Sequence, residues 1–462
     1  MKNIKYFLLS FLIIVLFPKY SFAQMILSNL SSEREIVTNP IIGVMPIKTA
    51  NWDDNHIISL VHYGSSKYND GSFFIDGDIY YHIDACGASV FYLTTVGTNA
   101  TKRVMIGNHT ITDFCIVGDT IYMCGQNSAG NNFVAYENVN ILFNTNNSLV
   151  NIFGLNNGIS DYTLTNIDFC ISAGQPTLLL LANKDGSLDS YFITYSLVTN
   201  TYITYQSPDS RLLDIDHTND YIAVLGMKGD SIFTLTRHPI NNISTYIGKE
   251  FTTGRLYTHF WDPKYHLASQ KDSNHVVVAA STNSIGGLEF HVINLNNLSI
   301  LYTQTILDSR DGRSKIMDLE FDEQRNILYC LFCSGFYNKD VIIQMRPYHT
   351  QNYHALVSMP QTYNTSSGYN LLKDITLYGD NSQLLTLGRT PTLNIYLFDR
   401  IFDFNFLSAC DQIEGLYSGI VENSIRRTSF SYSSPILPPF SSTTLQQVQL
   451  NKSITGYSVI CQ

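Results

Sequence analysis

The chain has 462 residues, of which 44% are hydrophobic, 13% aromatic and only 14% charged, and its formal net charge is -10. A negative charge of this size repels nucleic acids and anionic membrane surfaces, so we do not expect the protein to bind either. The length allows two or three domains, but a repeat that covers most of the chain favours a single one.

The first residues predict a secretory signal peptide. Lys2 and Lys5 precede an apolar stretch over residues 6–17, and Ser21-Phe22-Ala23 offers small residues before a cleavage point. The apolar stretch is shorter than the roughly 20 residues that span a bilayer, which argues against a membrane anchor. We expect residues 1–23 to be removed and the mature chain to be exported to the periplasm, the cell surface or the medium. The Ala-Gln junction and the richness in Tyr and Asn resemble exported proteins of the Bacteroidota.

A pattern of short apolar runs separated by polar turns returns seven times along the chain. Second strands are expected at residues 55–60, 121–125, 177–182, 221–226, 275–280, 327–331 and 383–388. Third strands are expected at 132–136, 190–195, 231–235, 288–293, 340–345 and 393–397, and the best fourth strand lies at 298–302. A polar residue in each first strand marks the repeat, and the positions taken as equivalent are Thr49, Asp113, Asp168, Asp214, Ser269, Asp318 and Asp374.

This period and strand count, over roughly residues 45 to 400, resemble the β-propeller superfamily. The signatures of WD40, kelch and sialidase-like repeats are absent, so no named family's functional residues can be transferred. The resemblance implies an all-β, seven-bladed β-propeller, with eight blades as the alternative. We assign residues 24–410 to the propeller and residues 411–462 to a C-terminal closing or appended β segment. Residues 25–44 are expected to supply the outer strand of the last blade.

Eight cysteines in an exported chain allow up to four disulfides. A two-residue hairpin turn at 118–119 places Cys124 diagonal to Cys115, which permits a bridge without favouring it. The C-x-x-C pair that ends at Cys333 lies within one strand and lacks a second pair, so it predicts neither a metal site nor a redox site. The preferred disulfide joins Cys410 to Cys461, which bracket the non-repetitive tail.

The repeated aspartates sit at the start of the innermost strands and should approach one another near one mouth of the central channel. A ring of carboxylates is a suitable site for calcium. A repeated Asp at a strand entry more commonly accepts hydrogen bonds from the backbone of its own or a neighbouring blade, and we favour that structural role. The Asp-Gly pairs at 185–186 and 311–312 lack the rest of a calcium loop and predict turns. No metal site is therefore predicted.

No catalytic motif is present. The chain lacks a Gly-x-Ser-x-Gly elbow and a His-Glu-x-x-His pair, so we predict no catalytic residues and no cofactor. His62 and His82 lie in polar, turn-rich sequence and are expected at the surface. An enzyme is accordingly the less favoured interpretation.

The 30 tyrosines are the remaining functional signal. Tyrosines in loops stack on sugar rings or anchor protein partners. The longest inter-strand excursion after residue 300 is expected at residues 346–368, and the binding residues predicted in or beside it are Tyr348, Tyr353, Tyr363 and Tyr369. Our first hypothesis is thus an exported, non-catalytic scaffold that binds a protein or a glycan. The alternatives are a propeller enzyme of the glycosidase or lyase type acting on polysaccharide or peptide, and a purely structural envelope component.

Overall fold

In a computed structural model, the described residues run from Val44 to Gly456, with gaps in many of the connections between strands. They belong to one compact unit, Ile42–Gln462. Side chains are described between Ile47 and Leu377, again with gaps. The predicted signal peptide and residues 25–43 lie outside the described residues. Within the described part, no helix is long and apolar enough to cross a membrane.

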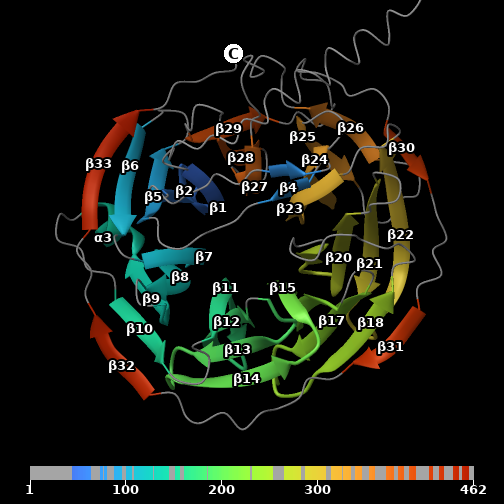
Figure 1. Ribbon diagram of the computed structural model, residues 1–462, viewed down its shortest axis with the longest axis horizontal. Helices are drawn as coiled ribbons and strands as arrows, with labels where there is room; N and C mark the ends of the chain where they lie inside the picture. The colour runs from blue at the N-terminus through green and yellow to red at the C-terminus, as the bar shows by residue number, and fades with distance from the viewer. Residues whose placement is uncertain are drawn as a thin grey trace, which may run out of the picture. The chain divides into compact units, whose positions relative to one another are not determined.

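The strands pair into antiparallel sheets, which are numbered here in chain order (Figure 1). The first sheet contains β1 (Val44–Asp53), β2 (His56–Tyr63), β5 (Ala88–Thr95), β6 (Ala100–Ile106) and β33 (Leu450–Gly456). The second contains β7 (His109–Val117), β8 (Thr120–Asn127), β9 (Asn132–Asn138), β10 (Asn151–Asn156) and β32 (Ser441–Gln446). The third contains β11 (Tyr162–Ser172), β12 (Gln175–Lys184), β13 (Ser190–Ser196) and β14 (Thr201–Ser207).

The fourth sheet contains β15 (Arg211–His217), β16 (Tyr221–Met227), β17 (Ile232–Pro239), β18 (Ile247–Thr252) and β31 (Arg426–Phe430). The fifth contains β19 (Tyr265–Gln270), β20 (His275–Ser281), β21 (Gly287–Asn294), β22 (Ser299–Asp308) and β30 (Leu416–Gly419). The sixth contains β23 (Ser314–Asp322), β24 (Ile327–Ser334), β25 (Lys339–Met345) and β26 (Tyr353–Ser358), and the seventh contains β27 (Leu371–Tyr378), β28 (Gln383–Arg389) and β29 (Ile395–Ile401). The other described elements are a pair, β3 (Phe73–Ile75) and β4 (Asp78–Tyr80), and one short helix, α3 (Val139–Asn144).

The all-β prediction is confirmed, and packing explains why the second strand of each repeat is so apolar. In β12 every residue from Thr177 to Asn183 is buried, because both faces of the sheet are covered. Five hydrophobic clusters each combine side chains of two consecutive sheets, from the first and second to the fifth and sixth. The sheets therefore pack face to face in the order of the chain.

The first strands of the sheets lie next to one another. Contacts join β1 to β7, β7 to β11, β11 to β15, β15 to β19, β19 to β23 and β23 to β27, and β27 contacts β1 in turn. These seven strands thus form a closed series within the described residues.

The C-terminal strands are added one by one to outer edges. β33, β32, β31 and β30 pair antiparallel with β6, β10, β18 and β22, and Figure 1 shows them in red at the rim. Their order around the sheets is the reverse of their order in the chain. Among the described residues, β14 of the third sheet, β26 of the sixth and β29 of the seventh receive no such strand. The tail is therefore distributed over four sheets instead of forming one appended sheet, while the predicted boundary at residue 410 stays a prediction.

The predicted hairpin turn at Gly118-Asp119 is confirmed, because Val117 pairs with Thr120 and Gly118 has a φ of 55°. Four cysteines are described, and all are free thiols: Cys115, Cys124, Cys170 and Cys330. The permitted bridge between Cys115 and Cys124 does not form, and the preferred pair, Cys410 and Cys461, lies outside the described residues.

A β-bulge interrupts most of the first strands, and in three sheets a glycine lies opposite the residue that precedes it. In β7 the register shifts between Ile111 and Asp113, and Ile111 pairs with Gly125 of β8. Leu212 and Gly226 repeat this pairing in the fourth sheet, as do Leu372 and Gly388 in the seventh. A Cβ atom on Gly125 would lie 1.9 Å from the backbone oxygen of Thr110. At Gly125 the two backbones therefore come too close for a side chain.

Replacing Gly125 with Ala should therefore lower the free energy of unfolding by about 2 kcal/mol or more, because the clash is with backbone and cannot be relieved by a rotamer change. Gly174→Ala is the matched control: Gly174 has a φ of 77° but no atom within 4 Å of the added Cβ, so it should cost only about 1 kcal/mol of backbone strain. Urea unfolding followed by tryptophan fluorescence measures both. Equal costs for the two variants would contradict the close approach at the bulge.

Candidate functional site: acidic side chains of the first strands

The residue that follows the bulge occupies the same place in each first strand. The pairing registers and the links between sheets place seven residues in this class, and they are Lys48, Asp113, Asn166, Asp214, His266, Asp318 and Asp374. The predicted equivalence is thus confirmed for four aspartates and wrong for Thr49, Asp168 and Ser269, which lie one, two and three residues further along. A repeat that is defined by its Asp residues aligns Asp168 with Asp113. In the structure the bulge decides which residues are equivalent, and the sequence pattern does not reveal the bulge.

The four aspartates of this class each connect their own sheet to the next through the backbone, as predicted. In each case an Oδ2 atom accepts a hydrogen bond from a backbone N–H of the following first strand. The links are Ile167 N to Asp113 at 2.8 Å, Leu267 N to Asp214 at 3.0 Å, Ile375 N to Asp318 at 2.9 Å and Thr49 N to Asp374 at 2.5 Å. A carboxylate that accepts a backbone donor is both satisfied and fixed in place, so these residues hold the sheets together.

Lys48 is the basic member of this class. Its Nζ lies 2.8 Å from Oδ1 of Asp113, and the two side chains are 34% and 10% exposed. Burial works to lower the pKa of Lys48, but the carboxylates of Asp113 and Asp374 outweigh it and raise the pKa. Lys48 therefore stays charged and offsets part of the negative charge around it.

Asp318 and Asp374 form a hydrogen-bonded carboxyl pair on neighbouring strands. Burial raises the pKa of Asp374 well above its usual range, and the nearby charge of Asp318 raises it further. Two carboxylates in contact do not both ionise readily, which is why the charge of Asp318 adds to the raised pKa of Asp374.

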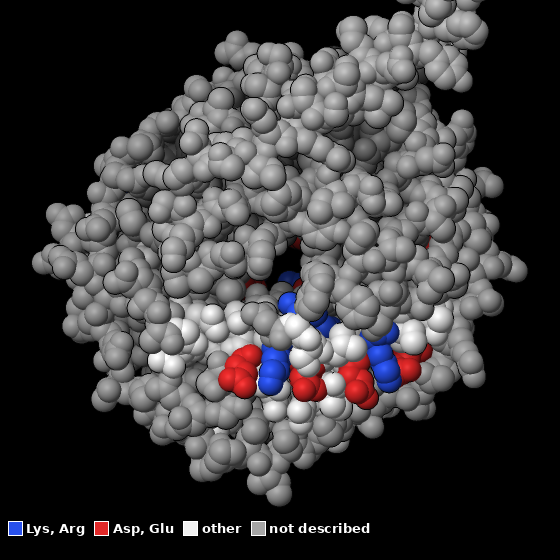
Figure 2. Space-filling view, in the orientation of Figure 1, with Lys and Arg blue, Asp and Glu red and all other residues white. Residues whose placement is uncertain are grey.

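A second row of acids lies two residues further along three of the strands. Asp168, Asp216 and Glu320 share a face with Asn166, Asp214 and Asp318, because side chains alternate along a strand. Figure 2 shows acidic and basic side chains inside an opening of the surface. In the sequence, each acid of this second row stands two positions after the residue that follows the bulge, and this spacing is the pattern by which the row could have been found.

The environments of these acids differ. Burial, followed by the charges of Asp318 and Asp216, raises the pKa of Glu320 to about 8. Burial also raises the pKa of Asp214 to about 7. Asp168 is the exception: burial works to raise its pKa, but the hydrogen bond and charge of His217 outweigh it and the pKa is lowered. At neutral pH the set therefore contains both protonated and ionised carboxyl groups.

His217 joins the third and fourth sheets. Its Nδ1 lies 2.9 Å from Oδ2 of Asp168, with side chains 22% and 27% exposed. Burial works to lower the pKa of His217, but Asp168 outweighs it and the pKa is raised. Oδ1 of Asp216 accepts the backbone N–H of His217 at 2.7 Å. One ligand atom from each of Asp168, Asp216 and His217 lies within 4.8 Å of the others, so these residues are able to hold a metal ion.

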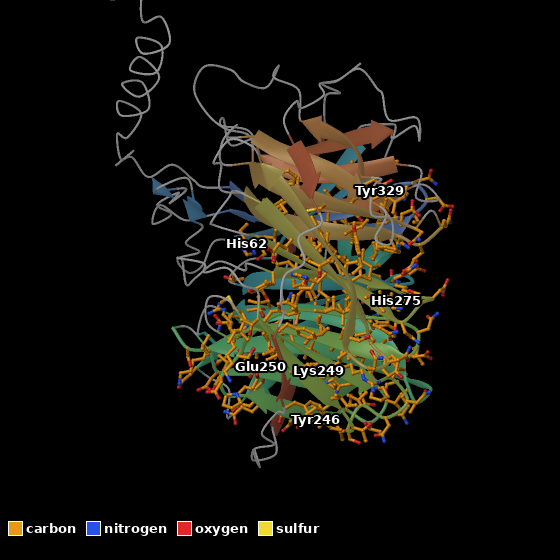
Figure 3. The ribbon with its side chains drawn as sticks, turned by 90° about the vertical axis from the view of Figure 1, so that its right-hand side faces the viewer. His62, Tyr246, Lys249, Glu250, His275 and Tyr329 are labelled. Carbon is orange, nitrogen blue, oxygen red and sulfur yellow. The ribbon has the colours of Figure 1, made fainter. Side chains whose placement is uncertain are left out.

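The hairpins that follow the first strands are also linked from sheet to sheet. Figure 3 shows His275, at the start of β20, on the side where these hairpins turn, and His62 on the opposite side. On the hairpin side, Lys271 N donates to Oε1 of Glu323 at 2.5 Å, and Asn219 Nδ2 donates to Asp272 at 2.9 Å. This face is therefore held by polar contacts close to the acidic rows.

The predicted binding tyrosines cannot be placed with their side chains. Tyr348, Tyr363 and Tyr369 lie outside the described residues, and so does the side chain of Tyr353, which begins β26. The expected excursion over residues 346–368 is not one loop, because β26 pairs with β25 inside it. The connections on either side of β26 remain the places where these tyrosines are expected to act.

The prediction that His62 lies at the surface is wrong. Its side chain is buried, and Nε2 donates to the carbonyl oxygen of Ile111 at 2.6 Å. Burial lowers the pKa of His62 to about 4, so the ring is neutral at physiological pH. His62 lies near the end of β2 and links the first sheet to the second. His82 lies outside the described residues.

Comparisons with known proteins bear on the fold. No family model matches the chain, and no curated protein matches it. Among solved structures, the chain is similar to the Dos1 propeller, with 10% identity, a TM-score of 0.48, and coverage of 77% of this chain and 95% of that one. It is also similar to the β-propeller domain of the trilobed protease from Pyrococcus furiosus, with 9% identity, a TM-score of 0.42, and coverage of 80% and 98%. A prolyl endopeptidase is matched at 8% identity and a TM-score of 0.46, over 85% of this chain and 52% of that one. The described strands pair into antiparallel sheets of mostly four or five strands, and two of these solved structures are β-propeller domains by their descriptions.

Proposed function

We propose that the chain is a seven-bladed β-propeller and that it serves as an exported, non-catalytic scaffold that binds a protein or a glycan. Each of the seven sheets supplies one blade, and the closed series of first strands supports this number. Export rests on the predicted signal peptide. The binding residues of the proposal are the predicted tyrosines on either side of β26.

One observation supports the non-catalytic role above the others. The recurring aspartates, which are the most prominent chemical groups of the repeat, accept backbone hydrogen bonds from the next sheet. A general acid or base has to exchange protons with a substrate, whereas these carboxyl groups are committed to holding sheets together. Function then resides in the loops that the scaffold presents.

The test uses the mature chain from Gln24 and a triple variant, Tyr348→Ala, Tyr363→Ala and Tyr369→Ala. Binding to a panel of immobilised polysaccharides and to envelope protein extract is quantified for both. We expect the triple variant to lose at least tenfold in binding with an unchanged circular dichroism spectrum. Tyr202→Ala, on the outer strand of the third sheet, is the matched control and should bind normally. Equal binding by the triple variant and the control would refute the assignment.

A second candidate function is favoured by one specific observation. Glu320, with its pKa raised to about 8, and Asp168, with its pKa lowered, provide a protonated and an ionised carboxyl group in the same acidic set. Environments that separate two carboxyl groups in this way are those that glycosidases use for acid and base. Turnover of a polysaccharide or peptide by the wild type, lost in both Glu320→Gln and Asp168→Asn, would establish the enzyme in place of the scaffold.

A further inference from the structure

The third and fourth sheets place two carboxylates and an imidazole unusually close together. Asp168, Asp216 and His217 each offer an atom within 4.8 Å of the others. Two carboxylates at this distance repel each other. His217 supplies at most one positive charge to this set. A divalent cation would neutralise both carboxylates at once.

A separate observation concerns Ser269. Its side chain is only 4% exposed, and its Oγ has no hydrogen-bond partner. A buried hydroxyl without a partner is costly, so its presence needs an explanation. The backbone N–H of the same residue donates to Oδ2 of Asp216 at 2.6 Å, which places Ser269 directly beside the carboxylate.

The face on which Ser269 lies follows from packing. Tyr265 and Leu267 of β19 belong to the cluster between the fourth and fifth sheets. Side chains alternate along a strand, so Ser269 points to the same side, toward β15. Ala268 packs on the other side, between the fifth and sixth sheets. The unpartnered hydroxyl is therefore directed toward the strand that carries Asp216.

Strand register supports the same conclusion. Ser269 pairs with Val276 as His217 pairs with Ile222, so the two residues occupy equivalent places in consecutive sheets. His217 reaches from that place to Asp168 in the preceding sheet. From the equivalent place in β19, Ser269 faces Asp216. Ser269 therefore lies next to Asp216, one of the three residues whose ligand atoms lie within 4.8 Å of one another.

We propose that Asp168, Asp216 and His217 bind one divalent transition-metal ion, with the hydroxyl of Ser269 beside it as a fourth ligand or as a partner of a metal-bound water. The mixture of carboxylate oxygen and imidazole nitrogen suits Zn²⁺ or Mn²⁺ better than Ca²⁺ or Mg²⁺, which take oxygen ligands. With bonds of about 2.0–2.1 Å, neighbouring ligand atoms lie about 3.3 Å apart, so small side-chain rotations suffice. This site does not depend on the proposed scaffold function.

The experiment uses the mature chain freed of metal with a chelator and then titrated with ZnCl₂ or MnCl₂ in a calorimeter. We expect one equivalent to bind and to raise the melting temperature. Asp216→Asn and His217→Gln should each weaken binding by about a hundredfold, and Ser269→Ala by about tenfold. Asp214→Asn is the matched control, because Asp214 lies on the same strand and face as Asp216 but outside the three-residue set, and it should bind the metal normally.

A second measurement keeps the proposal testable if a ligand variant fails to fold. Ser269→Cys retains the size of the side chain and should give an intense sulfur-to-cobalt charge-transfer band when Co²⁺ is added, which the wild type lacks. Absence of this band in a folded Ser269→Cys protein would overturn the role of Ser269. Absence of binding to the wild type, or equal affinity in wild type, Asp216→Asn and His217→Gln, would overturn the site itself.

Discussion

Replacing Lys48 with Met should destabilise the protein by about 2 kcal/mol at pH 7. The change leaves the carboxylate of Asp113, whose side chain is 10% exposed, without the ammonium group that lies 2.8 Å away. Breaking a fully buried ion pair by removing one partner costs about 3–5 kcal/mol. The lower figure takes into account that the side chain of Lys48 is 34% exposed and partly screened by water. Urea unfolding at pH 7 measures the loss.

Two controls define the cause of this loss. Lys48→Arg keeps the charge and should recover most of the stability. Lys184→Met removes a comparable ion pair, with Asp161 at 3.6 Å, but its side chains are 40% and 72% exposed, so the effect should stay below about 0.5 kcal/mol. If Lys48→Met lowered the stability as little as Lys184→Met, solvent and not Lys48 would be what compensates the charge of Asp113.

Replacing Glu320 with Gln should stabilise the protein at alkaline pH and leave it unchanged at pH 4. Burial and neighbouring charges raise the pKa of Glu320 from 4.5 to about 8. A carboxyl group with a raised pKa contributes stability while it is protonated, below about pH 4.5, and loses that contribution as the pH rises through its folded pKa near 8. Gln remains neutral throughout, so it avoids this loss. At pH 8.5 we expect a gain on the order of 2 kcal/mol.

The measurement is a pair of urea titrations at pH 4 and pH 8.5 for the wild type and Glu320→Gln. Asp209→Asn, at an exposed position, is the control and should show no difference at either pH. A Glu320→Gln protein that is less stable than the wild type at pH 8.5 would mean that the ionised carboxylate has partners that favour it. If the enzyme alternative holds, Glu320→Gln should remove the activity while it increases the stability. A buried acid that lowers the stability of the fold is then retained because the reaction needs it.

The sequence predicted the strands because local patterns determine them. Alternating or continuous apolar runs between turn residues located the second and third strands, and the hairpin at Gly118-Asp119 followed from its two-residue turn. The role of the recurring aspartates was also predictable, since a polar residue that returns with every repeat has to satisfy a need common to all repeats. These features depend on near neighbours in the chain.

What the sequence did not reveal depends on distant parts of the chain. The bulge shifts the register, so Asn166 and not Asp168 is the equivalent of Asp113. Asp168 then becomes available to contact His217 of the next sheet. The burial of His62 likewise depends on the second sheet, which covers it. The environment of each of these side chains depends on a residue about 50 positions away in the chain, and a local sequence pattern contains no information about such a residue.

The distribution of the C-terminal strands has a consequence for how the chain reaches its folded state. The outer edge of the first sheet is completed by β33 and that of the second by β32, which follow all seven first strands in the chain. Until they arrive, β6 and β10 present unpaired backbone groups that attract strands of other chains. Pairing of such distant segments is slow, so the nascent chain passes through a long interval in which self-association competes with folding. For a chain that is exported, as we propose, staying unfolded until β32 and β33 have crossed the membrane would shorten that interval.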